Sequence, residues 1–190
     1  MSHGPARTVG FTRMADGTRE DYLLLRELEQ RLTDELPDRL LRALDGLKDS
    51  FDGYQVTRYE HSLQAATRAL RDGRDEEYVV ATLLHDLGDE LAPHNHSEMA
   101  AAIVRPYVRE EVHWIIKHHG AFQMYYYAHH YGEDRDVRDR YADSPHYQAC
   151  VDFCERYDQA SFDPDYDTLP IGDFEPMLRR VLAEPRYGNG

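Results

Sequence analysis

The sequence has few cysteines and no excess of positive charge. Its 190 residues include two cysteines, Cys150 and Cys154, which lie four positions apart. Two thiols cannot build a disulfide scaffold or a four-cysteine metal site, so we expect them to pack as small apolar side chains in a reducing cytoplasm. The chain carries 22 basic and 36 acidic residues, a formal net charge of -14. Nucleic acids and anionic membrane surfaces both select basic patches, and we expect neither as a partner.

Long apolar runs and strand-like alternation are also missing. No stretch is apolar over the length that a bilayer-spanning helix needs, and the opening stretch MSHGPARTVGFTR lacks the apolar segment of a secretory signal. We therefore expect a cytoplasmic protein. Strict alternation of apolar and polar residues marks a half-buried strand, and the sequence shows none that would predict a sheet.

Helical spacing of apolar residues runs through most of the chain. In residues 20–36 the leucines recur three or four positions apart, which predicts an amphipathic helix. Proline, glycine and polar residues at the boundaries predict further helices. We expect these helices over residues 37–51, 57–73, 74–88, 96–108, 109–120, 144–162 and 173–185. The pattern predicts one all-α domain over residues 20–190, preceded by a loose N-terminal arm at residues 1–19.

Histidines are plentiful, and several lie on successive predicted helices. An adjacent pair, His85 and Asp86, ends the otherwise apolar helix of residues 74–88. A single packed histidine would not explain this pair, because further candidates follow on the neighbouring helices. These are His61, one of His94 and His96, one of His118 and His119, and Asp158. Six nitrogen and oxygen groups on successive helices can converge in the interior of a bundle, as metal ligands do in helical metalloproteins.

The adjacent positions of His85 and Asp86 suit two metal ions rather than one. Neighbouring residues on a helix point about 100° apart, so His85 can bind one ion while the Asp86 carboxylate reaches across to a second. A set of nitrogen and oxygen ligands favours iron, manganese, cobalt or zinc. Six protein ligands shared by two ions leave coordination positions open, which is typical of a catalytic site.

The pattern resembles the HD-domain superfamily, a helical family named for its His-Asp pair, over roughly residues 50–165. The segments EHSLQAA, ATLLHDLG, NHSEMAAAIV, WIIKHHGAF and VDFCERYD look like its branch of mixed-valent diiron oxygenases. That branch includes myo-inositol oxygenase and phosphonate-cleaving enzymes. The resemblance favours His96 over His94, His119 over His118 and Asp158 over Asp152. It implies two metal ions, bridged by Asp86, with the ligands His61, His85, Asp86, His96, His119 and Asp158.

The resemblance implies an enzyme that uses an Fe(II)/Fe(III) pair and O2 to oxidise a small hydroxyl-bearing substrate. Most members of the superfamily are instead metal-dependent phosphohydrolases. The alternative function is therefore hydrolysis of a nucleotide or another phosphoester with Mn²⁺ or another divalent metal. A third interpretation is a protein that keeps the fold and only binds a ligand or partner, and the complete ligand set weighs against it.

Two departures from the phosphonate-cleaving enzymes bear on the substrate. Those enzymes place a Tyr and a Glu before the first histidine, where the pair gates the substrate-binding iron. This chain has Phe51 and Tyr54 at the matching positions, and only Tyr54 carries an oxygen that could bind a metal. Basic side chains hold the phosphonate in that branch, whereas the matching positions here are Asp89, Gln123 and Glu155. Cleavage of a phosphonate is therefore not expected.

Asp89 is a candidate substrate-binding group from its spacing alone. On a continuous helix, residues 85, 86 and 89 share one face, which would bring the Asp89 carboxylate beside the metals. A carboxylate repels phosphate and attracts hydroxyl groups or a cation, which predicts a neutral or cationic small substrate. The alternative is that Gly88 ends the helix and Asp89 caps the next turn.

An aromatic segment follows the fourth histidine. We expect most of its aromatic side chains to pack in the core, with some of them forming the wall of a substrate pocket. Gln123 lies four residues after His119, so it would face the same way and is the polar candidate for that pocket. The aromatic residues are Phe122, Tyr125, Tyr126, Tyr127 and Tyr131.

Overall fold

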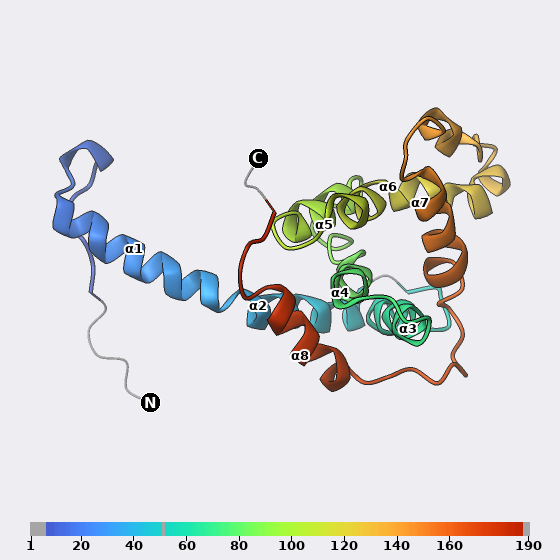
Figure 1. Ribbon diagram of the computed structural model, residues 1–190, viewed down its shortest axis with the longest axis horizontal. Coiled ribbons are helices and arrows are strands. Elements are labelled where there is room, and N and C mark those ends of the chain that lie inside the picture. The colour runs from blue at the N-terminus through green and yellow to red at the C-terminus, as the bar shows by residue number, and fades with distance from the viewer. Residues whose placement is uncertain (1–6, 51, 188–190) are drawn as a thin grey trace. The chain divides into compact units, whose positions relative to one another are not determined.

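The computed structural model describes residues 7–50 and 52–187, and every regular element in those ranges is helical (Figure 1). This confirms the all-α prediction. None of the helices in the described part of the chain combines the length and the apolarity that a bilayer crossing needs.

The contacts divide the chain into two units, Met1–Arg39 and Leu40–Gly190. The first unit contains helix α1 (Arg19–Asp34), whose amphipathic pattern the leucine spacing predicted. Thr18 caps α1, because its hydroxyl accepts a hydrogen bond from the Asp21 amide at 3.2 Å and the Asp21 carboxylate accepts one from the Thr18 amide at 2.9 Å. The predicted boundary after residue 19 stays a prediction.

The second unit is built from helices joined by turns and loops. Helix α2 (Leu36–Gly46) leads into it from the first unit. Short 3-10 turns lie at Leu47–Asp49, Ala128–Tyr131 and Val137–Tyr141. The remaining elements are α3 (Arg58–Arg71), α4 (Glu76–Leu84), α5 (His96–Val104), α6 (Glu110–Tyr127), α7 (Tyr147–Phe153), a π-helical turn (Cys154–Asp158) and α8 (Ile171–Val181).

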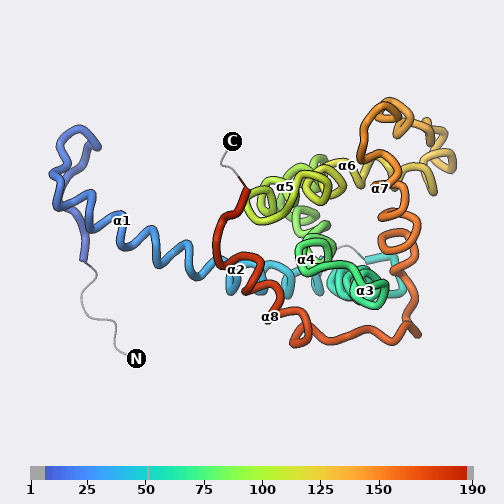
Figure 2. Tube along the Cα trace, in the orientation of Figure 1, coloured from blue at the N-terminus to red at the C-terminus, as the bar shows by residue number. Residues whose placement is uncertain are grey.

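Helix α4 lies at the centre of the second unit. Its residues from Tyr78 to Leu84 are all buried, which is why the sequence of this helix is apolar on every side. Helix α4 contacts α3, with α6 on one side and α8 on the other (Figures 1 and 2). The side chains at the carboxyl end of α4 therefore point into the interior of the unit.

Several predicted helix ends differ from the structure by four residues or more, and two of these errors involve glycine. The helix expected to reach Gly88 ends at Leu84, and the chain turns tightly over residues 85–91 instead. The helix expected to stop at Gly120 continues to Tyr127. Gly120 lies inside α6, and a Cβ there would meet Ser97 Oγ at 2.7 Å. The missing side chain therefore lets α5 and α6 approach each other.

The start of α3 is fixed by a reciprocal pair of hydrogen bonds. The Thr57 hydroxyl accepts a hydrogen bond from the Glu60 amide at 3.1 Å, and the Glu60 carboxylate accepts one from the Thr57 amide at 2.7 Å. This capping box satisfies amide groups that would otherwise have no partner at the helix end. It also fixes the first turn of α3, which carries Arg58 and His61 toward the interior.

Removal of a core side chain from α8 tests whether this last helix stabilises the second unit. Leu178 is fully buried, so Leu178→Ala is expected to lower the free energy of unfolding by about 2–5 kcal/mol through lost burial and a cavity. Leu91 is 76% exposed, and Leu91→Ala serves as the matched control with little expected change. Urea unfolding followed by circular dichroism measures both. Equal effects of the two substitutions would contradict a core role for α8.

Candidate metal centre

Two histidines from α3 and the end of α4 face each other in the interior. The Nε2 atoms of His61 and His85 lie 3.1 Å apart. The Nδ1–H of His61 donates to the Ser161 carbonyl at 3.0 Å, and that of His85 donates to the Thr82 carbonyl at 2.7 Å. A carbonyl can only accept, so these bonds place a proton on each Nδ1, and in the neutral rings the lone pair then lies on Nε2. Two opposed lone pairs repel each other unless a cation lies between them.

A second pair of histidines repeats this arrangement between α5 and α6. The Nε2 atoms of His96 and His119 lie 3.3 Å apart. The Nδ1–H of His119 donates to the Ile116 carbonyl at 2.7 Å, which again leaves the Nε2 lone pair facing inward. The alternative histidines, His94 and His118, lie outside this cluster: His118 donates to the Trp114 carbonyl at 2.8 Å instead.

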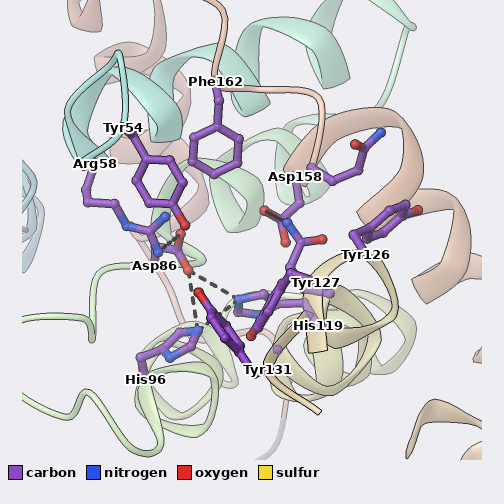
Figure 3. Close-up of a pocket in the computed structure, with 13 residues that line it drawn as sticks. Tyr54, Arg58, Asp86, His96, His119, Tyr126, Tyr127, Tyr131, Asp158 and Phe162 are labelled. Carbon is purple, nitrogen blue, oxygen red and sulfur yellow. Dashed lines mark hydrogen bonds and ion pairs between the residues drawn. The ribbon is translucent and has the colours of Figure 1, made fainter. Parts of the chain in front are cut away.

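The Asp86 carboxylate lies between the two histidine pairs. Its Oδ2 is 3.2 Å from the Nε2 atoms of both His61 and His85. Its Oδ1 is 3.3 Å from His119 Nε2 and 3.5 Å from His96 Nε2 (Figure 3). Each carboxylate oxygen of Asp86 therefore lies close to one histidine pair, which is the arrangement expected of a ligand that bridges two metal ions.

Asp158 completes the first pair from the π-helical turn. Its Oδ1 lies 3.4 Å from His61 Nε2, and its Oδ2 is buried with no hydrogen-bond partner among the described residues. In the π-helical turn the Gln159 amide donates to the Cys154 carbonyl, five residues back, at 3.0 Å. Such widened turns are frequent at functional sites. The other candidate, Asp152, accepts a hydrogen bond from Gln148 at 2.7 Å outside the cluster.

The donor atoms fit metal ions in three overlapping groups. Within each group the candidate ligand atoms lie within 4.8 Å of one another. Inward lone pairs, a buried carboxylate oxygen without a partner and a purely nitrogen and oxygen donor set are all properties of a metal site. The groups are His61, His85 and Asp86; His85, His119 and Asp158; and Asp86, His96 and His119.

Burial and charge act in opposite directions on these groups. Burial disfavours a charged His85 ring, but the Asp86 and Asp158 carboxylates outweigh it and raise the pKa of His85 to about 10. The pKa of His61 is raised for the same reason. Burial also opposes ionisation of Asp86, yet His85 and Arg58 hold the pKa of Asp86 well below its usual range. The buried carboxylates therefore require positive charge, which protons or metal ions can supply.

Arg58 is a member of the site that the sequence analysis did not identify. It occupies the first turn of α3, and its side chain is only 15% exposed. Its Nη2 lies 2.9 Å from Asp86 Oδ2, and its Nε donates to Asp89 Oδ2 at 2.6 Å. The sequence contained one signal for it: residues 58 and 61 lie three apart on a helix and share a face.

Asp89 does not lie on the helix that was expected to carry it. Since α4 ends at Leu84, the argument from a shared helix face is wrong, and Asp89 lies in the following turn instead. Its carboxylate pairs with Arg58, and its Oδ1 lies 3.6 Å from His96 Nδ1. Asp89 is not among the described residues that line the adjoining cavity.

A cavity of about 540 Å³ adjoins the second histidine pair. Asp86, His96, His119 and Asp158 contribute to its wall, whereas among the described residues His61 and His85 do not reach it. The first pair therefore lies behind the second one. Figure 3 shows Tyr54 and Phe162 on one side of the cavity and Tyr127 and Tyr131 on the other; the aromatic residues that line it are Tyr54, Tyr126, Tyr127, Tyr131 and Phe162.

The remaining candidates divide between cavity and core. Gln123 lines the cavity, and its Nε2 donates to Asp158 Oδ1 at 3.0 Å. Phe122 is fully buried, and the Tyr125 ring packs beneath two arginine side chains, so neither belongs to the cavity wall. Glu155 is exposed, and Phe51 lies outside the described residues.

The profile of the HD domain family matches residues 58–159, more than half of the chain. The chain belongs to the HD domain family. The match begins at Arg58, ends one residue after Asp158 and includes all six candidate ligands. The elements outside it in the second unit are the segment before α3 and the C-terminal helix α8.

The chain is also similar, over part of its length, to a curated protein. It is a glycine-betaine-forming dioxygenase of 1-hydroxy-2-(trimethylamino)ethylphosphonate from Leisingera caerulea. The two proteins are 30% identical over 88 residues, which cover 40% of this chain and 45% of the relative. The alignment therefore spans less than half of that dioxygenase.

Loss of one histidine from the second pair should remove one ion. His119→Ala deletes an inward Nε2 but leaves the first pair intact, so metal content is expected to fall from two ions per chain toward one. His130→Ala, which removes an exposed histidine outside the cluster, is the matched control. Elemental analysis of anaerobically purified protein, together with circular dichroism, measures content and folding. Two ions per folded chain in His119→Ala would show that His119 is not a ligand.

The raised pKa of His85 predicts how the stability of metal-free protein depends on pH. In the unfolded chain this pKa is about 6.5, and in the folded chain it rises to about 10. The extra stability is complete below pH 6.5 and is lost as the pH rises through about 10. The melting temperature of chelated protein is therefore expected to fall across this range, and His85→Gln should reduce the fall. Chelated wild-type protein that melts at one temperature throughout the range would contradict the assignment.

Proposed function

We propose that this HD-domain protein is a diiron oxygenase that oxidises a small hydroxyl-bearing substrate with O2. The observation that carries the proposal is the position of Asp86, with one carboxylate oxygen toward each of two histidine pairs. This geometry supports two metal ions with a shared carboxylate ligand. A mixed-valent Fe(II)/Fe(III) pair, when bound, would supply the electron transfer that an O2-dependent oxidation requires.

The two proposed metal positions differ in access. An ion at the inner position would be held by His61, His85 and Asp158, and an ion at the cavity-facing position by His96 and His119, with Asp86 available to both. Only three side chains would hold the cavity-facing ion, which would leave room for a substrate group to bind it. Its side chains line the cavity wall, which supports substrate binding at this ion.

Gln123 is proposed to orient the substrate. Its Nε2 donates to the Asp158 carboxylate, so the other end of the amide must be the carbonyl oxygen. That Oε1 is buried and has no hydrogen-bond partner in the described part of the chain. A buried acceptor without a partner costs free energy, and a substrate hydroxyl or N–H group would satisfy it. Tyr54 lines the same cavity, and the centre of its ring lies 4.5 Å from the centre of the Phe162 ring. We propose that Tyr54 controls access to the cavity-facing ion.

The cavity wall supports a neutral or cationic substrate. Aromatic faces attract ammonium groups and do not attract phosphate. The relative from Leisingera caerulea acts on a substrate with a trimethylamino group, and the chain here carries a net charge of -14. We therefore propose a small alcohol with an ammonium group as the substrate class.

Phosphoester hydrolysis with Mn²⁺ or another divalent metal is the alternative, and the charges at the cavity disfavour it. Arg58 is the one lysine or arginine among the described residues that line the cavity. Its guanidinium is already paired with Asp86 and Asp89, so it offers no uncompensated charge to a phosphate group.

Oxygen uptake by iron-loaded protein tests the reaction. We expect substrate-dependent oxygen consumption with one or more members of a panel of amino alcohols, quaternary ammonium alcohols and polyols. A parallel panel of nucleotides and other phosphoesters, assayed with Mn²⁺, provides the comparison. Phosphate release with Mn²⁺ and no oxygen uptake with iron would replace the oxygenase proposal by the hydrolase.

A pair of ligands of equal shape tests the charge preference of the cavity. Choline and 3,3-dimethylbutan-1-ol differ in the positive charge on the quaternary centre. A cation–π contribution of about 0.5–2 kcal/mol predicts that choline binds roughly two- to thirty-fold more tightly. Calorimetry on metal-loaded protein measures both affinities. Equal affinities would contradict a cation-binding wall.

A further inference from the structure

His96 differs from the other three histidines in what holds its second ring nitrogen. His61, His85 and His119 each donate Nδ1–H to a backbone carbonyl. The Nδ1 of His96 instead faces a carboxylate, at 3.6 Å from Asp89 Oδ1. His96 is also the most exposed of the four rings, with 25% of its side chain accessible at the edge of the cavity. A side-chain carboxylate therefore lies beside the nitrogen that in the other three rings donates to a backbone carbonyl.

Arg58 fixes the position of the Asp89 carboxylate. Its Nε donates to Asp89 Oδ2 at 2.6 Å, and its Nη2 lies 2.5 Å from the same oxygen. The same Nη2 lies 2.9 Å from Asp86 Oδ2. One guanidinium thus connects the carboxylate between the two histidine pairs to the carboxylate beside His96. With Oδ2 held by Arg58, the other oxygen of Asp89 faces the ring of His96.

The backbone of the turn after α4 brings Asp89 to this place. The Asp89 amide donates to the Asp86 carbonyl at 3.0 Å, which closes the turn. A Cβ at Gly88 would meet the carbonyl oxygen of His96 at 2.7 Å and its Cα at 2.8 Å. Only glycine allows the turn to rest against the His96 backbone. One short segment therefore makes three contacts. Asp86 lies between the two histidine pairs, Gly88 rests against the backbone of His96, and Asp89 lies beside the ring of His96.

We propose that Asp89, held by Arg58, is a positioning residue that orients His96 and sets the metal affinity of the cavity-facing position. This inference rests on the proposed two-metal centre. A carboxylate that accepts the Nδ1–H of a metal-bound histidine fixes its tautomer and makes its Nε2 a stronger ligand. Asp89 is not among the described residues that line the cavity, so its carboxylate acts on His96 and not directly on the substrate. The inner position has no such dependence, since its histidines are held by backbone carbonyls.

A metal titration of matched variants tests this role. Asp89→Asn removes the charge at constant size, and Glu90→Gln makes the same change at the next, exposed residue. Metal-free protein is titrated with Co²⁺ under anaerobic conditions, and the visible absorption of the bound ion reports its coordination. In Asp89→Asn the weaker binding step is expected to lose about 10- to 100-fold in affinity, with an altered spectrum for that ion. The tighter step, and both steps in Glu90→Gln, should match wild-type protein.

The outcomes separate the inference from the proposed function. Unchanged affinity in Asp89→Asn, or equal weakening of both steps, would overturn the positioning role, because a general structural defect affects both ions. Retained affinity for the first ion shows that the variant is folded. Wild-type protein that takes up a single ion would overturn the two-metal proposal and the inference together. Two unequal steps in wild-type protein, both unaffected by Asp89→Asn, would overturn the inference alone.

Discussion

The site depends on one constraint: the buried carboxylates at the centre of the second unit must be balanced by positive charge. The carboxylates of Asp86 and Asp158 are buried beside imidazoles whose Nδ1–H groups are committed to backbone carbonyls. The Nε2 atoms of His61 and His85 lie 3.1–3.8 Å from each other and from these carboxylates. Lone pairs and negative charges at such separations are stable only with cations among them. The Arg58 guanidinium is one such cation, beside Asp86, and protons or metal ions must supply the remaining positive charge.

The sequence predicted the helical class well and the helix ends poorly. Apolar residues recur every three or four positions wherever a helix packs on its neighbours, so burial leaves its period in the sequence. A glycine is ambiguous, because it can end a helix or make room for another backbone. Gly120 was expected to end a helix, but it lies within α6, where its missing side chain leaves room for Ser97. Gly88 was expected to end α4, but it lies four residues beyond the helix end, against His96. Only the packing partner decides between these roles.

The convergence of the candidate ligands could be predicted, whereas their supporting contacts could not. An adjacent histidine and aspartate on an apolar helix has few explanations besides a buried polar site, and the structure brings His85 and Asp86 together with the other candidates. An arginine in the first turn of a helix is an ordinary surface residue, so Arg58 gave no comparable signal. The expected role of Asp89 assumed an unbroken helix, and the turn after α4 changed the direction of its side chain.

The contacts of the site differ in how many residues separate the partners along the chain. The partners within each histidine pair are close in sequence, whereas the segment that carries Asp158 is far from His61. His61 and His85 are separated by 24 positions, and His96 and His119 by 23, so each pair belongs to one helical hairpin. The Ser161 carbonyl that holds His61 comes from 100 positions away, on the segment that also carries Asp158. Short loops close at a lower entropic cost than long ones, so each hairpin can form its pair before the last segment docks. Under the two-metal proposal, each hairpin would offer an ion one histidine pair before the Asp158 segment docks, and the supply of metal would then affect folding as well as activity.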